Sequence, residues 1–362
     1  MDLSTLKICF IAGTLGRGGA ERQLYYILRC LVQQGARPHL FSLTRGEFWE
    51  EHIRALGVPV EWVGRRASRL ARAAAIARHA AALKPNVIQS QHFHTNLYAT
   101  VAARINGLKE IGALRSNARS EVRANGPLFG ALSLRGPRHL AANSLEAIRN
   151  AQALGVPSNR LHLLPNVVDV DEFCPPMERP PRPFTILGVG RMGPEKRFDR
   201  FVKVVARARL ETSGRVRGVL VGAGPEQMRL ERLCQEYHLT PDGLVFAGPE
   251  NCMVRRYHQA DILLLTSDYE GTPNVVLEAM ACGMPVIAAG VGGVRDIVHD
   301  GDTGVLLDPD DVSGMVDWVV RLAADEELCR AMGKRARVAV LQHYSPKAMP
   351  GHLSRLYEAV LG

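Results

Sequence analysis

The sequence is 362 residues long, with a mass of 39.7 kDa, and this length indicates two domains of ordinary size. Hydrophobic residues make up 46% of it and charged residues 22%, which excludes an intrinsically disordered chain. Lys and Arg (45) outnumber Asp and Glu (36), so phosphates, acidic lipid headgroups and nucleic acid all stay open as partners.

The positive charge is concentrated in the first half of the chain. Residues 1–175 contain 22 basic and 12 acidic residues, whereas the remainder is close to neutral. We expect the basic half to face something anionic, the alternative being a basic surface that serves solubility alone. The seven cysteines are scattered and fit neither a zinc cage nor a disulfide framework, which favours a cytoplasmic protein without a metal site. No apolar run is long enough for a membrane span, so the protein is expected to be soluble or peripheral.

Short apolar runs alternate with longer helical stretches through the first half. The expected strands are 8–12, 39–42, 60–63, 87–90, 111–114 and 140–142. The expected helices are 19–34, 68–83, 95–106 and 144–153. This alternation predicts a mostly parallel sheet with helices on both faces.

A glycine-rich loop, Gly13 to Glu21, follows the first expected strand and leads into a helix. Glycines let the backbone approach a ligand closely, and a helix N-terminus offers N–H donors to a phosphate. Gly18 and Gly19 are therefore candidates for a diphosphate site. The spacing matches neither the dinucleotide fingerprint nor the Walker pattern, and a tight strand-to-helix turn is the alternative explanation.

Polar residues follow two later strands of this half. His92, His94 and Asn96 come after 87–90, and Arg115 comes after 111–114. One of the two histidines is expected to orient or deprotonate an acceptor hydroxyl, unless both are loop residues with local hydrogen bonds. Arg115 is expected to bind a phosphate of the donor or the acceptor, or to pair with a carboxylate.

Two basic clusters account for much of the excess charge. They are Arg65, Arg66, Arg69 and Arg72, followed by Arg119, Arg123, Arg135 and Arg138. The apolar segment 127–134 lies inside the second cluster. Basic residues beside an apolar segment can dock on an anionic membrane, here the inner face of the cell membrane. The alternative is a core helix with solvated arginines.

A proline-rich stretch near 165–184 breaks the alternation and is typical of a linker. We therefore divide the chain into an N-terminal domain (1–170), a linker (171–183), a second domain (184–345) and a C-terminal helix that can pack back on the first domain (346–362). Strands are expected after the linker at 185–189, 218–221, 244–246, 262–265, 286–289 and 305–307. Helices are expected at 197–210, 225–237, 251–259, 274–282, 311–323 and 326–342. The prediction is two tandem doubly wound domains with a cleft between them.

Two loops at strand ends in the second domain carry candidate binding residues. Arg191 and Lys196 follow the strand 185–189, and two cations there suit a doubly charged leaving group, although a solvated loop explains them equally well. Gly222 and Gly224 form a glycine turn after the strand 218–221. Such turns mark the edge of the sheet where open α/β proteins bind ligands.

Two carboxylates follow the strand 262–265. Glu270 lies on a loop, and Glu278 lies about one turn into the next helix. The residues that lead into this helix are Gly271, Thr272, Pro273 and Asn274. Carboxylates beside a helix N-terminus are unusual for phosphate binding alone, but they suit a nucleotide sugar, whose ribose and sugar hydroxyls they can bind.

The motifs together resemble one family along nearly the whole chain. Glu270 and Glu278 with their intervening Gly-Thr-Pro-Asn-Val-Val-Leu are similar to the Glu-x7-Glu signature of retaining family-four glycosyltransferases of the GT-B fold. Further likenesses are Gly18-Gly-Ala-Glu21, Asn143-Ser-Leu-Glu146, Leu164-Pro-Asn-Val-Val-Asp169, Gly190-Arg191 with Lys196, and Val221-Gly-Ala-Gly-Pro225. The resemblance implies two tandem Rossmann-like domains facing a cleft.

It also implies an activity. A hexose is expected to move from a nucleotide sugar, with UDP as the expected nucleotide, to a hydroxyl of a lipid-linked or saccharide acceptor. The configuration of the anomeric carbon is expected to be retained, without a covalent enzyme intermediate. Cell-surface polysaccharide, lipopolysaccharide or glycolipid synthesis is the expected setting. Neither a metal nor another cofactor is expected.

The resemblance assigns roles to single residues. Arg191 and Lys196 hold the donor diphosphate and stabilise the leaving nucleotide, which is electrostatic catalysis by fixed cations. Glu278 binds the ribose and Glu270 contacts the transferred sugar. The backbone at Gly271–Asn274 and at Gly18–Gly19 completes the phosphate pocket.

Two other functions remain as alternatives. A nucleotide-sugar epimerase on the same fold needs acid and base groups around the sugar but no acceptor site. A non-catalytic binder of nucleic acid or another anionic polymer is suggested by the basic charge. Aromatic residues make up only 6% of the chain and do not interleave with arginines, which disfavours nucleic acid.

Overall fold

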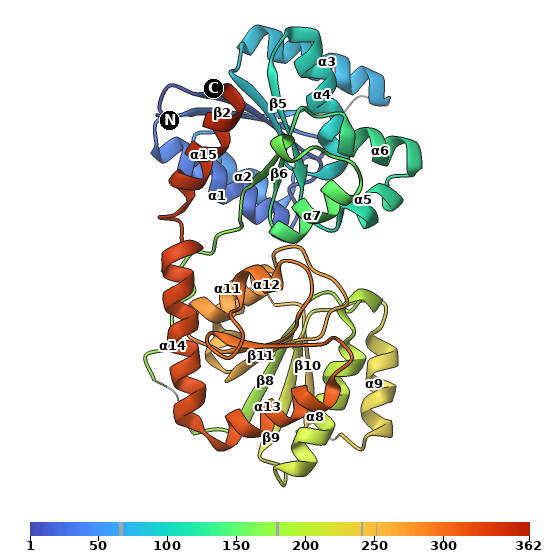
Figure 1. The fold of residues 1–362 in the computed structure, drawn as a ribbon, viewed down its shortest axis with the longest axis vertical. Helices are drawn as coiled ribbons and strands as arrows, with labels where there is room; N and C mark the ends of the chain where they lie inside the picture. The colour runs from blue at the N-terminus through green and yellow to red at the C-terminus, as the bar shows by residue number, and fades with distance from the viewer. Residues whose placement is uncertain (65–67, 179–180, 240–241, 251) are drawn as a thin grey trace. The chain divides into compact units, whose positions relative to one another are not determined.

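The computed structural model describes residues 1–64, 68–178, 181–239, 242–250 and 252–362. The chain forms two compact units (Figure 1). Unit 1 contains Met1–Val167 and Pro346–Gly362, and unit 2 contains Val168–Ser345. The stretch 171–183, expected as a linker, is thus counted within unit 2. Of the first expected basic cluster, Arg65 and Arg66 lie outside the described residues, as does Pro180 of the proline-rich stretch.

Unit 1 contains a seven-stranded parallel sheet in the order β3-β2-β1-β4-β5-β6-β7. Its strands are β1 (Lys7–Ala12), β2 (Arg37–Ser42), β3 (Val60–Trp62), β4 (Val87–Ser90), β5 (Lys109–Leu114), β6 (His139–Ala142) and β7 (Leu161–Leu163). The sequence did not predict β7, a strand of three residues that ends just before Leu164 and Pro165. The strand order reverses between β1 and β4, which is where doubly wound sheets bind ligands.

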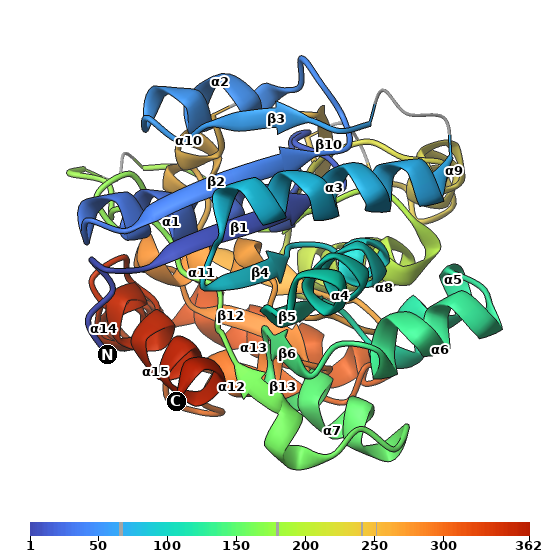
Figure 2. The ribbon, with the colours of Figure 1, turned by 90° about the horizontal axis from the view of Figure 1, so that it is seen from above.

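Helices cover both faces of this sheet (Figures 1 and 2). They are α1 (Gly19–Gln33), α2 (Phe48–Ala55), α3 (Arg69–Leu83), α4 (Asn96–Asn106), α5 (Ala118–Ala124), α6 (Pro127–Arg135), α7 (Leu145–Ala153) and α15 (Met349–Leu361). Because side chains alternate along a strand, Ile8 and Phe10 of β1 pack with α1 and α15, while Cys9 and Ile11 pack with α3 and α4.

Helix α15 is therefore part of unit 1, although it follows unit 2 in the sequence. Its buried residues include Leu353, Leu356 and Tyr357. The Tyr357 hydroxyl donates a 2.8 Å hydrogen bond to Gln89 Oε1 on β4. At the boundary of the two units, the Gln23 side chain on α1 bonds both backbone groups of Val167.

Unit 2 contains a six-stranded parallel sheet in the order β10-β9-β8-β11-β12-β13. Its strands are β8 (Phe184–Val189), β9 (Val216–Val221), β10 (Leu244–Gly248), β11 (Ile262–Leu265), β12 (Val286–Ala289) and β13 (Gly304–Leu307). Its helices are α8 (Phe198–Glu211), α9 (Gln227–Glu236), α10 (Met253–His258), α11 (Asn274–Ala281), α12 (Val294–Ile297), α13 (Val312–Ala324) and α14 (Glu326–His343). Here the strand order reverses between β8 and β11. Both units confirm the predicted doubly wound α/β architecture.

Candidate functional site

The two loops that flank the switch point of unit 2 are joined by an ion pair. Lys196 follows β8 and Glu270 follows β11, and Lys196 Nζ lies 2.6 Å from Glu270 Oε1. The Ser267 hydroxyl donates a second hydrogen bond, also 2.6 Å, to the same carboxylate oxygen. The structure thus brings together two of the residues that the sequence singled out, at the sheet edge where a ligand is expected.

Arg191 lies on the same loop as Lys196 and is exposed. Within the described part of the chain, its guanidinium has neither a hydrogen bond nor an ion pair. Lys196, in contrast, is only 21% exposed in its side chain. One cation is therefore fixed by a carboxylate and the other is free to meet a phosphate, an arrangement that suits a diphosphate.

A second set of contacts holds these loops in place. Arg200 on α8 is almost fully buried and donates to the Thr266 carbonyl oxygen, to Asp268 and to Asp310. The Thr266 hydroxyl donates to the Lys196 carbonyl oxygen at 3.0 Å. Since a buried charge requires partners, these bonds stabilise Arg200 and fix the loop after β11 against the loop after β8.

Glu278 occupies a different environment from Glu270. It lies on α11, its side chain is buried, and its Oε2 accepts a 2.7 Å hydrogen bond from the Tyr257 hydroxyl. Tyr257 lies on α10 and is itself fully buried. The hydroxyl therefore fixes the orientation of the carboxylate that is predicted to bind ribose, and that role stays a prediction.

Helix α11 begins at Asn274, four residues after Glu270. Its N-cap is Pro273, in an extended conformation, so the proline precedes the first helical residue rather than occupying it. Thr272 is buried, whereas Gly271 and Asn274 are half-buried. The Gly271 carbonyl oxygen accepts a 3.0 Å bond from the Gly293 amide of the loop after β12. The predicted phosphate-binding segment is thus held by the neighbouring loop after β12.

The glycine turn after β9 is explained by close packing of the backbone. A Cβ atom at Gly222 would lie 2.0 Å from the Gly190 carbonyl oxygen, and one at Gly224 would lie 2.5 Å from the Met192 carbonyl oxygen. The Gly222 amide donates to the Gly248 carbonyl oxygen. These glycines let the loop after β9 approach the loop that carries Arg191. Their donor-binding role stays a prediction.

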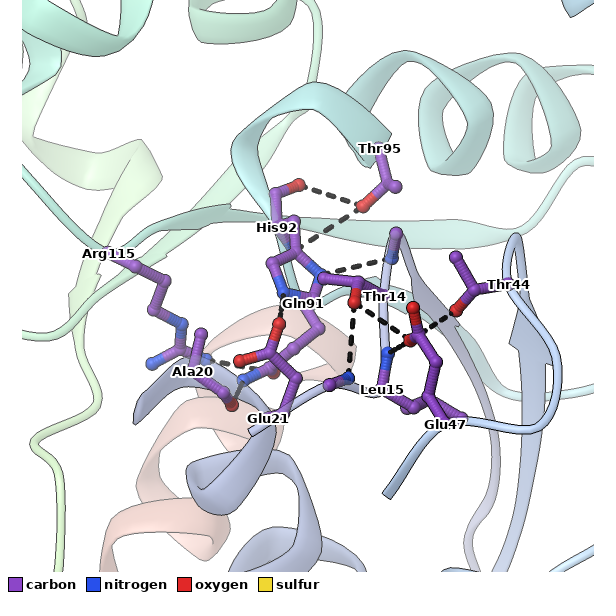
Figure 3. Close-up of polar contacts among 12 residues, drawn as sticks. Thr14, Leu15, Ala20, Glu21, Thr44, Glu47, Gln91, His92, Thr95 and Arg115 are labelled. Atoms are coloured by element: carbon purple, nitrogen blue, oxygen red, sulfur yellow. Dashed lines mark hydrogen bonds and ion pairs between the residues drawn. The ribbon is translucent and has the colours of Figure 1, made fainter. Parts of the chain in front are cut away.

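In unit 1, His92 joins the loops at the corresponding switch point (Figure 3). The Gly13 amide donates to His92 Nδ1 at 3.0 Å, which places the proton of a neutral ring on Nε2. Nε2 lies 3.0 Å from Glu21 Oε1, so it donates to that carboxylate. Both ring nitrogens are occupied, and this arrangement does not favour the expected catalytic role of His92.

His94 offers a different possibility. Its ring stacks on His92 with centroids 5.5 Å apart and lies directly over Gly13, where a Cβ atom would come within 2.0 Å of Nε2. Partial desolvation, with the neighbouring His92, lowers the pKa of His94 to about 4. The ring is therefore neutral near pH 7 and has a lone pair for a hydroxyl proton. His94 remains the acceptor-side candidate.

The glycine-rich loop of unit 1 is held by a carboxylate that the sequence analysis did not identify. Glu47 accepts hydrogen bonds from the Thr14 hydroxyl, the Leu15 amide and the Thr44 hydroxyl (Figure 3). Partial burial disfavours the charged form of Glu47, but these bonds outweigh it and lower the pKa. A carboxylate at the loop repels a phosphate there.

Local packing also explains why a glycine occupies position 18. Its amide donates to the Gly16 carbonyl oxygen at 2.9 Å, and a Cβ atom there would lie 2.0 Å from Glu21 Oε2. Gly19 begins α1, and Gly18 is its N-cap. The Gly18 amide is therefore already used, and close approach to Glu21 accounts for the glycine without a phosphate.

Asn96 contradicts the expectation that it contacts an acceptor. It is fully buried, its Nδ2 donates to the Ala113 and Ser133 carbonyl oxygens, and its Oδ1 accepts from the Ala113 amide at 2.7 Å. These bonds join β5 to α6. Because the side-chain amide is occupied within the core, Asn96 is a structural residue.

Arg115 follows β5 and is half-buried, and its Nη2 donates to Gln91 Oε1 at 3.3 Å (Figure 3).

Sequence reasoning missed three residues that organise the two sites, namely Glu21, Glu47 and Tyr257. Glu21 was visible only as part of a family motif, and no local signal distinguishes the other two. In the described ranges, no group of three or more His, Cys, Asp or Glu side chains is arranged to hold a metal ion.

Two family models match the chain. Residues 17–172 match the model "Glycosyltransferase Family 4", and residues 170–339 match "Glycosyl transferases group 1". The N-acetyl-alpha-D-glucosaminyl L-malate synthase of Bacillus anthracis is 35% identical over 166 residues, which cover 46% of this chain and 43% of that protein.

A second relative is the GDP-mannose-dependent alpha-(1-6)-phosphatidylinositol monomannoside mannosyltransferase of Mycolicibacterium smegmatis. It is 29% identical over 225 residues, or 58% of each chain. The chain spans about half the length of most of the curated relatives it matches, and less of some.

Among solved structures, Anabaena Alr3699/HepE in complex with UDP and glucose has the same fold, with a TM-score of 0.85. The two chains are 18% identical, and the match covers 98% of this chain and 100% of that one. The two parallel-sheet α/β units and this structural neighbour together establish the GT-B fold.

Proposed function

Since this chain belongs to the glycosyl transferases of group 1, we propose that it moves a sugar from a nucleotide-sugar donor to an acceptor hydroxyl. The observation that carries the proposal is the Lys196–Glu270 pair at the switch point of unit 2, beside the exposed Arg191. A pure phosphate site does not need a carboxylate at that position, whereas a nucleotide sugar has both charge and hydroxyls to bind. UDP is the expected nucleotide, and the UDP-bound neighbour supports testing it first.

The donor roles follow from these positions. Arg191 and Lys196 meet the diphosphate and stabilise the charge that grows on it as the glycosidic bond breaks. Glu270 Oε1 is occupied by Lys196 and Ser267, and Oε2 has no partner among the described residues, so it is available to a sugar hydroxyl. Glu278, oriented by Tyr257, binds the ribose. We propose that these fixed charges act without a metal or another cofactor.

Retention of the anomeric configuration is proposed because the segment from Glu270 to Glu278 resembles the Glu-x7-Glu signature of retaining family-four glycosyltransferases. The acceptor is proposed to be a lipid-linked or saccharide hydroxyl, with cell-surface polysaccharide, lipopolysaccharide or glycolipid synthesis as the setting. His94, neutral near pH 7, is the group of unit 1 best suited to orient that hydroxyl. The epimerase alternative needs none of these acceptor features, and it differs in leaving the nucleotide attached to the sugar.

The test is to incubate the full chain with single UDP-, GDP- and ADP-sugars in the presence of a membrane extract. We expect nucleotide release that depends on the extract, together with transfer of the labelled sugar into it with the donor's anomeric configuration. The Lys196→Ala protein, prepared in parallel, controls for contaminating enzymes. A changed sugar still attached to its nucleotide favours the epimerase, and binding without turnover of any donor favours the polymer-binding alternative.

We further propose that the α5–α6 surface of unit 1 docks on an anionic membrane, at the cytoplasmic face. None of the helices in the described part of the chain has the length and apolar character needed to cross a bilayer. On α6, Leu128, Phe129 and Leu132 are exposed by 66%, 48% and 46%. The exposed Arg119 and Arg123 lie on α5, next to α6. Apolar side chains beside arginines suit a bilayer surface with acidic headgroups.

Vesicle flotation tests this surface. The wild-type protein is expected to float with vesicles that contain phosphatidylglycerol, less so at high salt, and not with pure phosphatidylcholine. The double variant Leu128→Ser/Phe129→Ser is expected to bind these vesicles at least about tenfold more weakly, because it loses the apolar contact. Leu210→Ser/Val338→Ser, which alters two exposed apolar residues of unit 2, is the matched control. Equal flotation of both variants would rule out this surface.

A further inference from the structure

A polar cluster lies within unit 1 between the sheet and the helices α1 and α15. It consists of Gln89 on β4, Gln91 just after β4, Arg115 just after β5, and Tyr357 on α15, and we call it the Arg115 cluster. Gln89, Gln91 and Tyr357 are fully buried, and Arg115 is half-buried. The cluster is at the carboxyl ends of β4 and β5, beside the switch point of the sheet.

The side-chain acceptors of the cluster are already in use. Gln89 Oε1 accepts from the Tyr357 hydroxyl at 2.8 Å, and Gln91 Oε1 accepts from Arg115 Nη2 at 3.3 Å. The side-chain nitrogen of Gln91, Nε2, donates to the Ala20 carbonyl oxygen of α1 at 2.6 Å (Figure 3). Gln91 is thereby fixed between α1 and the arginine.

Donors, in contrast, are in surplus. Gln89 Nε2 and Arg115 Nε are both buried, and neither has a hydrogen-bond partner among the described residues. Nor does any carboxylate of the described ranges form an ion pair with Arg115. Glu21, on the neighbouring helix α1, is bonded to His92. Two buried N–H donors without acceptors, beside a half-buried positive charge without an ion-pair partner, are costly, so the cluster is complementary to a group that carries acceptors and negative charge.

Arg115 keeps its charge in this environment. Burial lowers the pKa of Arg115 to about 10, so the guanidinium is protonated near pH 7. Its planar fork matches the two oxygens of a carboxylate or phosphate. Tyr357 is fully buried, and burial raises its pKa, so it is a neutral donor that holds Gln89 in place.

We propose that the Arg115 cluster is an anion site of unit 1, which receives a carboxylate or phosphate group of the acceptor through Arg115 and Gln89. The assignment to the acceptor rests on the proposed function, whereas the existence of the site does not. Unit 2 has its own cations, Arg191 and Lys196, for the donor diphosphate. A second anion site in the other unit therefore indicates that the acceptor is itself acidic.

Hydrogen exchange of the full chain, followed by mass spectrometry, tests the site without requiring an acceptor. Inorganic phosphate at constant ionic strength, with chloride as the reference, is expected to protect peptides that span 87–92 and 113–118. Arg115→Gln is expected to abolish this protection. Arg115→Lys keeps the charge but loses the planar fork, and about tenfold more phosphate is expected to be needed. Arg78→Gln removes an exposed arginine of the same unit and is the charge-matched control.

The outcomes separate the possible conclusions. Equal protection in the wild type, Arg115→Lys and Arg115→Gln overturns the site, as does the absence of protection at 113–118 in the wild type. Should Arg115→Gln fail to fold, Tyr357→Phe, which frees Gln89, is expected to weaken the protection instead.

UDP is expected to protect 190–197 and 267–276 but not 113–118. Protection of 113–118 by UDP assigns the anion to the donor and overturns the acceptor assignment. If UDP does not protect 190–197 and 267–276 in the wild-type protein, the proposed function is contradicted, whereas the phosphate result at Arg115 still stands.

Discussion

Replacing Lys196 by alanine is expected to lower the rate of sugar transfer about 100- to 1,000-fold, the cost of removing one fixed donor from a site of developing negative charge. Lys196 Nζ is held 2.6 Å from Glu270 Oε1, and its stem passes Gly190, where a Cβ atom would lie 3.5 Å from Lys196 Cε. The ammonium is thus fixed at the end of β8. Because the charge on the leaving diphosphate grows in the transition state, the loss is expected mainly in kcat, measured as nucleotide release.

The control for this variant is Lys334→Ala, which removes the same charge from an exposed position on α14 of the same unit. Lys196→Arg, which keeps the charge but changes its geometry, is expected to fall between the two. The thermal unfolding temperature shows whether each variant is folded. A Lys196→Ala enzyme with kcat within about twofold of wild type would contradict the proposed role.

Glu270→Ala is expected to reduce kcat/KM by about 100- to 1,000-fold, comparable to the loss at Lys196. Its Oε1 accepts from Lys196 and Ser267, and its Oε2 is available to the transferred sugar, so alanine removes both the sugar contact and the partner that positions the cation. Glu270→Gln keeps the shape and one acceptor oxygen. It is expected to lose about 10- to 100-fold, since hydrogen bonds to charged groups contribute about 1.5–3 kcal/mol.

Glu327→Ala, at an exposed position on α14, is the matched control for Glu270→Ala. The double variant Lys196→Ala/Glu270→Ala distinguishes two explanations. If the two residues only position each other, the double variant loses no more activity than either single variant. If each residue also contacts the donor, the double variant loses more activity than either single variant. We expect the second result, and a Glu270→Ala enzyme as active as the Glu327→Ala control would refute it.

The sheet strands were predicted closely because buried parallel strands appear as short, continuous apolar runs. The bounds of β4, β11 and β12 agree with the expected runs 87–90, 262–265 and 286–289. Helices α2, α5 and α12 were not predicted. They have eight, seven and four residues, and segments this short show a helical period only weakly. For 127–134, the sequence left membrane docking and a core helix open, and the structure shows helix α6 with exposed apolar residues.

For the site, the sequence indicated which loops matter but not how their residues pair. Lys196 and Glu270 were both singled out, and the structure places them in contact. His92 was expected to act on an acceptor, yet its ring is held by Gly13 and Glu21. Asn96 was expected beside it and is instead buried, with its amide bonded to the backbone. Adjacent polar residues after one strand look alike in sequence, and only packing decides which are exposed to a ligand.

The sequence by itself determined the two α/β halves, the uneven charge and the motif-bearing loops, because hydrophobic period and local composition are properties of neighbouring residues. The tertiary structure alone decided which polar groups meet, since partners such as Tyr357 and Gln89 are 268 residues apart. It also decided that α15 completes unit 1 and that Arg115 has no carboxylate partner among the described residues. Among the described arginines of the first half, Arg115 is held in a buried polar cluster whose surroundings fit an anion.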